Sequence, residues 1–293
     1  MLWFAKNLER QVPYQMRIIK IVTDSSSNLL ELSDVAFASA PLKINTADGE
    51  EFVDTKELDA EAMVAFFDQY KGKSKTSCPN TSDWLEAFAG GEDIFCVTIT
   101  SGLSGSYNSA CAAREIYEAE HPGTRVCVID SLSAGPELEL IVEKLVQWIE
   151  EGKSYQQICE DVHKYMEHTE LLFMLESLKN FAANGRVSPT VAKVAGFFGI
   201  RIVGRASDEG QLQPLSKCRG QARSLESILA YMQENGLQKG KVRIAHCMNH
   251  SAAEQLAQMI AQAIPGAEIS IRPCRGLCCY YAEKGGLLVA FEK

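Results

Sequence analysis

The sequence predicts a two-domain α/β protein in which a mostly parallel sheet flanked by helices is followed by a mixed α/β domain. In residues 17–168, strand-like apolar runs alternate with helical segments, which is the order of a parallel sheet covered by helices. In residues 169–293, a hairpin-like pair of strands interrupts this alternation. The 293 residues, 46% of them hydrophobic and 23% charged, suffice for one large domain or two closely packed ones. Residues 1–16 precede the first strand as an N-terminal extension whose role the sequence does not indicate.

Hydrophobic periodicity places the elements of the first domain. Strands are expected over 17–23, 93–100 and 125–130. Helices are expected over 59–71, 80–89, 134–151 and 154–168, and a further helix is expected to run from the turn at 101–106 to residue 119. Short strands within 35–54 flank Asp48-Gly49, which is a strong hairpin signal. Asn80 or Ser82 is the expected N-cap of the second helix, because both side chains accept hydrogen bonds from free backbone amides.

The second domain is expected to begin with the strand 171–175, followed by a short helix that ends before Asn184. Two strands flank Asp208-Glu209-Gly210 and are expected to form a hairpin. The remaining helices are expected over 188–199, 220–235 and 251–263. The remaining strands are expected over 200–206, 211–216, 241–247, 267–272 and 286–292.

Charge and hydropathy argue against nucleic acid and membranes as binding partners. The formal charge is -9, which gives nucleic acid and anionic membrane surfaces little electrostatic attraction. No run approaches the roughly 20 apolar residues of a spanning helix, and charged residues interrupt the N-terminus where a signal peptide would be apolar. We therefore expect a cytoplasmic protein with peripheral or no membrane association and no nucleic-acid partner.

The ten cysteines are expected to be mostly free and buried. Five of them lie inside apolar strand or helix patterns, namely Cys96, Cys111, Cys127, Cys159 and Cys247. The cluster Cys274, Cys278 and Cys279 is close enough to hold a soft metal or to oxidise. Its spacing matches no common zinc or iron–sulfur pattern, so we expect no metal and no cofactor.

Three polar turns are candidates for an anion site: Asp24–Ser27, Lys75–Asn80 and Thr100–Ser106. The last lies between a predicted strand and a predicted helix, where free backbone amides and the positive end of the helix dipole favour an anion. In an open parallel sheet, ligands bind beyond the carboxyl ends of the strands, where these turns would converge. Ordinary helix capping is the alternative explanation of each turn.

A serine hydrolase is the principal alternative function. Gly102-Leu-Ser104-Gly-Ser106 nearly matches the nucleophile-elbow pattern Gly-x-Ser-x-Gly at a strand-to-helix junction. Asp130 and His246 follow at later strand ends, in the order Ser, Asp, His. However, Ser106 replaces the last glycine of the pattern, and no second glycine-rich loop offers an oxyanion hole.

The motifs together resemble the DegV family, and the resemblance covers residues 17–293. Segments of the family occur here in the family's order: Val22-Thr23-Asp24-Ser25-Ser26, Thr76-Ser77-Cys78-Pro79, Ser101-Gly102-Leu103-Ser104-Gly105-Ser106-Tyr107, Asn184-Gly185-Arg186-Val187-Ser188 and Asp208-Glu209-Gly210. The resemblance implies an EDD fold of two α/β domains with a long-chain fatty acid in a tunnel between them. It also implies a lipid-binding protein that is the substrate-binding subunit of a bacterial fatty acid kinase. A separate ATP-binding subunit would phosphorylate the carboxylate. A stand-alone lipid carrier would use the same site.

The resemblance also implies site residues. Thr76 and Ser101 match the carboxylate-binding hydroxyls of the family, with the Gly102 amide assisting. Arg186 matches an arginine near the carboxylate and the kinase-facing surface, and His246 matches a family histidine, for which packing in the core is an equal alternative.

The acyl tail would supply most of the affinity. Each buried methylene contributes ~0.8 kcal/mol, which gives ~11 kcal/mol as an upper bound for the tail of a C16 acid. Tails of C14–C18 are expected; the exact length and unsaturation depend on packing. Met174, Phe197 and Phe198 are candidate tunnel-lining residues, with ordinary core packing as the alternative for each.

One departure from the family concerns Tyr281. The family's His-x-Gly-Pro-Gly motif is replaced here by Tyr281-Ala-Glu-Lys-Gly285, so Tyr281 stands in the place of the histidine. A tyrosine still donates a hydrogen bond to a carboxylate but does not titrate near neutral pH. The change therefore bears on coupling to a kinase more than on binding of the fatty acid. Cys78 similarly replaces the family's usual glutamine.

Overall fold

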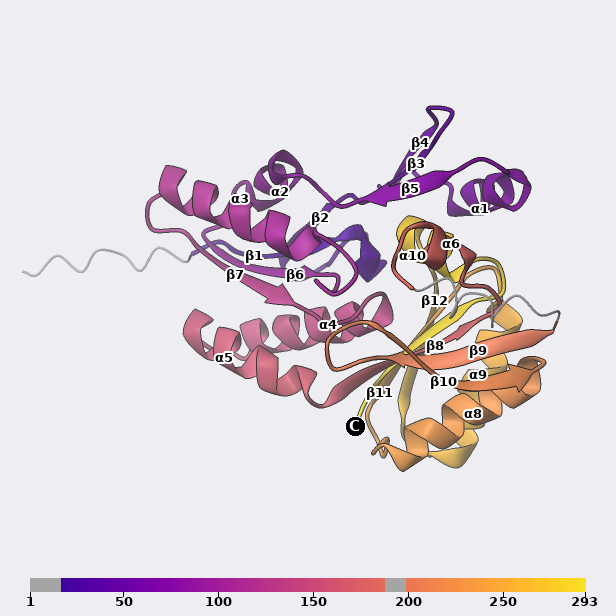
Figure 1. The fold of residues 1–293 in the computed structure, drawn as a ribbon. Helices are drawn as coiled ribbons and strands as arrows, with labels where there is room; N and C mark the ends of the chain where they lie inside the picture. Colours follow the sequence, from indigo (N-terminus) through magenta and orange to yellow (C-terminus); the bar gives the residue numbers. More distant parts are fainter. Residues whose placement is uncertain (1–16, 188–198) are drawn as a thin grey trace, which may run out of the picture.

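The computed structural model describes residues 17–187 and 199–293 and contains three β-sheets (Figure 1). A four-stranded sheet has the order β2-β1-β6-β7, a six-stranded sheet the order β10-β9-β8-β13-β11-β12, and a small sheet the order β4-β3-β5. The first two sheets are covered by helices, which confirms the predicted α/β class.

The first sheet is parallel throughout. Its strands are β1 (Ile19–Asp24), β2 (Ala36–Ala40), β6 (Asp93–Thr98) and β7 (Arg125–Asp130). One face is covered by α2 (Thr81–Phe88) and α3 (Ser106–Glu120), the other by α4 (Pro136–Glu150) and α5 (Tyr155–Met166) (Figure 1). The two apolar cores contain Trp84 and Phe88 on one side and Phe95 and Leu145 on the other. Asn80 caps α2 through a capping box with Asp83.

The second sheet is mixed, because only β11 and β12 pair in parallel. Its strands are β8 (Thr169–Leu175), β9 (Ile200–Ala206), β10 (Leu212–Arg219), β11 (Lys241–His246), β12 (Glu268–Pro273) and β13 (Leu287–Glu292). Helices α8 (Gln221–Glu234) and α9 (His250–Ala263) pack on one face around Leu225, Ile228 and Leu256. Helix α4 contacts strands of both larger sheets and so lies between them.

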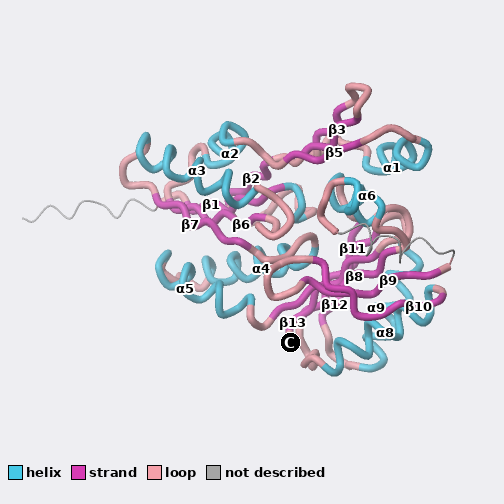
Figure 2. Tube along the Cα trace, in the orientation of Figure 1, coloured by secondary structure: helices cyan, strands magenta, loops and turns pink. Residues whose placement is uncertain are grey.

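A small third sheet lies beside the larger two (Figure 2). It contains β3 (Lys43–Thr46), β4 (Glu51–Val53) and β5 (Ser74–Ser77), with the predicted hairpin turn at Asp48 and Gly49. Helix α1 (Ala60–Gln69) packs against α10 (Gly276–Ala282), and α6 (Lys179–Ala183) adjoins α10. The sequence did not predict β5, α10 or the short 3-10 turn η1 (Ser25–Ser27).

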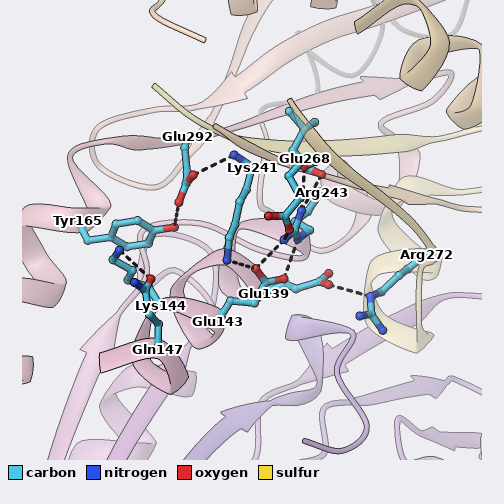
Figure 3. Close-up of polar contacts among 11 residues, drawn as sticks. Glu139, Glu143, Lys144, Gln147, Tyr165, Lys241, Arg243, Glu268, Arg272 and Glu292 are labelled. Atoms are coloured by element: carbon cyan, nitrogen blue, oxygen red, sulfur yellow. Dashed lines mark hydrogen bonds and ion pairs between the residues drawn. The ribbon is translucent and has the colours of Figure 1, made fainter. Parts of the chain in front are cut away.

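Charged side chains fix α4 to the second sheet (Figure 3). Glu143 binds Arg243 through two contacts of 2.7 Å and Lys241 at 2.8 Å. One helical turn earlier, Glu139 pairs with Arg272 at 2.8 Å. These pairs neutralise the acidic side of α4 where it meets β11 and β12, so the two larger sheets are held in one arrangement.

Candidate functional site

A cavity of about 260 Å³ lies between the first and second halves of the chain. Its wall is mostly apolar and includes Leu42, Ile99, Leu103, Leu171, Phe173, Leu175, Phe181, Leu212, Leu277 and Leu288. The residues come from the segments that follow β2, β6 and β7, from β5, from the second sheet and from α10, so the cavity exists only where the two halves meet. An apolar space of this kind suits a flexible hydrocarbon chain.

Strand β8 forms one wall of the cavity with alternate residues. Leu171, Phe173 and Leu175 line the space, while Leu172 and Met174 belong to the core beneath α8 and α9. Successive side chains of a strand point to opposite faces of the sheet. The prediction of Met174 as a lining residue is therefore wrong by one position. Phe197 and Phe198 lie outside the described residues.

Polar side chains gather at one end of the cavity: Thr76, Ser104, Arg186 and Tyr281 all line it. The hydroxyl oxygens of Thr76 and Tyr281 lie 2.7 Å apart. The Arg186 guanidinium donates from Nε to the carbonyl oxygen of Leu103 at 3.1 Å, beside Ser104. These four side chains come from β5, the turn before α3, the segment after α6, and α10. Three hydroxyls and one guanidinium are thus available to an anionic group.

Tyr281 is held as a neutral phenol. Burial raises the pKa of its hydroxyl, although the hydrogen bond with Thr76 and the positive charge of Arg186 act in the opposite direction. Its ring packs against Phe181 at a centroid distance of 4.5 Å. At neutral pH the phenol therefore keeps its proton and can donate it to an anion.

Asn184 is a site residue that the sequence analysis did not single out. Its side-chain oxygen accepts a hydrogen bond from the backbone amide of Thr76 at 3.0 Å. Its side-chain nitrogen donates to the hydroxyl of Tyr280, the neighbour of Tyr281, at 3.1 Å. The available signal was the family segment Asn184-Gly185-Arg186, of which Asn184 is the first residue.

The structure corrects the prediction for Ser101 and Gly102. Neither residue lines the cavity, and Ser101 is exposed, with its amide bonded to Asp130 at 3.0 Å. The Gly102 amide donates to Thr100 at 3.0 Å, and a Cβ at Gly102 would lie 2.6 Å from the carbonyl oxygen of Glu209. The turn therefore places Gly102 against the β9–β10 hairpin, leaves Ser101 exposed and leaves Ser104 lining the cavity.

His246 also lies away from the cavity, contrary to prediction. It ends β11 in a separate hollow of about 490 Å³ that Asn28, Arg272 and Arg275 also line. Burial lowers the pKa of its imidazole, and nearby His250 lowers it further. His246 is only 9% exposed and packs near the core, which was the alternative reading of this residue.

The three groups of the hydrolase hypothesis are not assembled. Ser104 lines the cavity, whereas Asp130 and His246 line two other hollows. One carboxylate oxygen of Asp130 accepts the amides of Ser101 and Leu132. Among the described residues, no hydrogen bond joins Ser104, Asp130 or His246 to another of the three.

The cysteines are free thiols in the structure. Cys279 donates to the carbonyl oxygen of Cys274 at 3.2 Å, and Cys278 donates to that of Ser26 at 3.4 Å. Burial holds the pKa of the Cys278 thiol well above its usual range. Within residues 17–187 and 199–293, no group of three or more histidine, cysteine or acidic side chains is arranged to hold a metal ion. Nor does that part of the chain contain a helix long and apolar enough to cross a bilayer.

Comparison with known proteins agrees with this architecture. A family model described as "Uncharacterised protein, DegV family" matches residues 18–293. A DegV domain-containing protein of Streptococcus pneumoniae is 42% identical over 277 residues, which cover 93% of this chain and 98% of the relative. A relative from Streptococcus gordonii is 40% identical, with the same coverage.

Two solved structures are similar over nearly the whole fold. A DegV family protein from Eubacterium eligens loaded with heptadecanoic acid has a TM-score of 0.92 and 43% identity, and covers 94% of this chain and 99% of its own. The fatty acid kinase (Fak) B3 protein of Streptococcus pneumoniae loaded with linoleic acid has a TM-score of 0.91 and 41% identity, with the same coverage. The chain belongs to the DegV family.

Proposed function

We propose that the cavity binds a long-chain fatty acid. The observation that carries the proposal is an apolar space along β8 that ends in the donor group of Thr76, Ser104, Arg186 and Tyr281. In this proposal the carboxylate lies among these donors and the tail lies along the apolar side chains of β8, Leu171, Phe173 and Leu175. The fatty acids in the two similar structures support this assignment of ligand class.

The energetics of such a ligand fit the site. Each methylene moved from water into an apolar wall contributes ~0.8 kcal/mol, so the tail provides most of the affinity. The hydroxyls of Thr76, Ser104 and Tyr281 are neutral donors that orient the carboxylate while leaving its oxygens reactive, and Arg186 supplies the only charge among the four. Burial of the tail thus supplies most of the affinity, and the four donors orient the carboxylate.

We further propose that the chain presents this carboxylate to a separate ATP-dependent kinase subunit, which forms the acyl phosphate. The likeness to a protein named as a fatty acid kinase B component supports this role. The polar end supplies donors, and no nucleotide-binding loop was found in the sequence, so in this proposal the chain binds and orients but does not itself catalyse. A stand-alone carrier would hold the same ligand, yet would yield no acyl phosphate with ATP and a kinase subunit.

Native mass spectrometry of the purified protein, followed by denaturing extraction and lipid identification, tests the binding function. A co-purifying or added fatty acid of C14–C18 bound at one per chain is the expected result. A protein that is empty and ignores added palmitic acid would contradict the proposal. Labelling of Ser104 by a fluorophosphonate probe would then support an esterase, although the separation of Ser104 from His246 argues against such labelling.

A further inference from the structure

The donor group at the polar end is assembled from segments that have little rigidity of their own. Thr76 lies on β5, an edge strand of the small sheet, and Tyr281 lies on α10, a helix of seven residues. Isolated helices of this length are not stable in water, and an edge strand has one row of unpaired backbone groups. Contacts with the rest of the chain therefore set the relative position of the two hydroxyls.

Asn184 makes that contact with both of its side-chain polar atoms. Its oxygen accepts the Thr76 amide at 3.0 Å, so the side chain occupies the place of a missing neighbouring strand. Its nitrogen donates to the Tyr280 hydroxyl at 3.1 Å and to the carbonyl oxygen of Asn180 at 2.9 Å. The Tyr280 hydroxyl in turn lies 2.7 Å from the Ser74 hydroxyl on β5. Strand β5 is thus tied to Asn184 directly and through Tyr280.

The same residue reaches the third member of the donor group. The guanidinium of Arg186 donates from Nη1 to the backbone carbonyl of Asn184. Asn184 is half-buried, and its side-chain hydrogen bonds are part-buried, where an unmade hydrogen bond is costly. One side chain and its backbone therefore contact the segments that carry Thr76, Tyr281 and Arg186.

We propose that Asn184 is a positioning residue that sets Thr76 and Tyr281 at the distance a carboxylate requires. The inference rests on the proposed fatty-acid function and adds a residue to it. Loss of the side chain removes the partner of the Thr76 amide and one of the two hydrogen-bond contacts of the Tyr280 hydroxyl. The Thr76 and Tyr281 hydroxyls then no longer share one fixed geometry, and the ligand loses orientation rather than tail contact.

A purely structural role as a helix cap is the competing explanation, and the chain offers a matched control for it. Asn184 is the C-cap of α6 and donates to the carbonyl four residues back, that of Asn180. Asn235 is the C-cap of α8 and donates in the same way to Tyr231 at 2.8 Å. Asn235→Ala removes the same kind of cap without touching the cavity.

The affinity test compares Asn184→Ala and Asn235→Ala for heptadecanoic acid by titration. Asn184→Ala is expected to weaken binding by about tenfold or more, the equivalent of one hydrogen bond to a charged group. Asn235→Ala is expected to stay near wild type. In the double variant Asn184→Ala/Thr76→Val, the fold-loss of affinity is expected to be smaller than the product of the fold-losses of the two single variants. Both changes disturb the same arrangement of hydroxyls, so their effects are not independent. Wild-type affinity in Asn184→Ala, or simple multiplication of the losses, would overturn the inference.

A second readout needs no ligand. In protein labelled with 3-fluorotyrosine, the fluorine signal of Tyr281 is assigned by its loss in Tyr281→Phe. Asn184→Ala is expected to shift that signal, and Asn235→Ala is not.

A wild-type protein that binds no fatty acid would refute the proposed function, while an unmoved Tyr281 signal in Asn184→Ala would refute the role of Asn184. If Asn184→Ala no longer melts cooperatively, Asn184→Asp is used instead, because it keeps the acceptor for Thr76, removes the donors and adds a negative charge. An unshifted Tyr281 signal in Asn184→Asp also overturns the inference.

Discussion

The hydroxyl oxygens of Thr76 and Tyr281 lie 2.7 Å apart, although 205 positions separate the two residues in the sequence. The bond joins the small sheet to α10 and places both groups at the polar end of the cavity. One of the two hydroxyls donates to the other in this arrangement, and the hydroxyl that accepts keeps its own proton to donate to an entering carboxylate. The bond therefore defines the head-group end of the proposed site.

Thr76→Val and Tyr281→Phe should each weaken retention of a fatty acid. Each change removes one hydrogen bond to a charged group, worth roughly 1.5–3 kcal/mol, and leaves the apolar wall intact. Titration with heptadecanoic acid measures the loss. Tyr117→Phe is the matched control, because its hydroxyl donates to Gly91 at 3.1 Å, away from the cavity lining. Wild-type affinity in both site variants would show that the carboxylate binds elsewhere.

The sequence predicted the large elements because their signals are local. Strand β7 and helix α4 carry long apolar patterns, and their observed bounds fall within two residues of the expected ones. Helix α10 was missed because its seven residues include only apolar or small side chains and tyrosines, so no polar face marks the helical period. Its N-terminal amides are bonded by Asp54, more than 200 positions away. No local pattern can reveal such a cap.

The candidate site shows the same limit. Thr76, Arg186 and Tyr281, which came from the family resemblance, lie together at the cavity. Ser101 does not, because the hydrogen bonds from Leu103 and Ser104 back to Thr100 reverse the chain and turn Ser101 outward. Spacing along a sequence identifies a turn, but the side chain that faces the ligand depends on backbone geometry within that turn.

Arg186→Ala should impair phosphoryl transfer more than binding of the fatty acid. The tail supplies most of the affinity, whereas the guanidinium is the only cation in the group of four donors around the proposed carboxylate. Acyl phosphate trapped as the hydroxamate, with ATP and a kinase subunit, measures transfer, and titration measures binding. Arg219→Ala, on the exposed side of β10, is the control. Equal loss of transfer and binding would mean that Arg186 acts simply as a carboxylate ligand.

Glu143→Ala should destabilise the fold by roughly 3 kcal/mol, the cost of breaking a buried ion pair on one side. Arg243, whose side chain is 5% exposed, would lose both of its 2.7 Å contacts and keep only the largely exposed Glu268 as a carboxylate partner. Urea unfolding measures the change. Glu150→Ala on the exposed end of α4 should be near neutral. If Glu143→Ala matches that control, the network does not hold α4 to the second sheet.

Glu137 should make the protein less stable as pH rises toward 7. The side chain is buried on α4 and accepts a hydrogen bond from Thr169 at 2.7 Å. Burial raises the pKa of its carboxyl from 4.5 to about 7, against the hydrogen bonds from Ser133 and Thr169. The folded state therefore holds this proton between pH 4.5 and about 7, where the unfolded state has released it.

The free energy of unfolding should thus fall across that window, by up to roughly 3 kcal/mol for a shift of about 2.5 pH units at 1.36 kcal/mol each. Glu137→Gln cannot ionise, so its stability should gain on that of wild type between pH 5 and pH 8, with the difference levelling above the folded pKa. Urea unfolding at four pH values measures both curves, and Glu150→Gln on the same helix should run parallel to wild type. If the curves of Glu137→Gln and wild type run parallel, the Glu137 carboxyl ionises equally in the folded and the unfolded chain. Its contact with Thr169 would then offset the cost of burial.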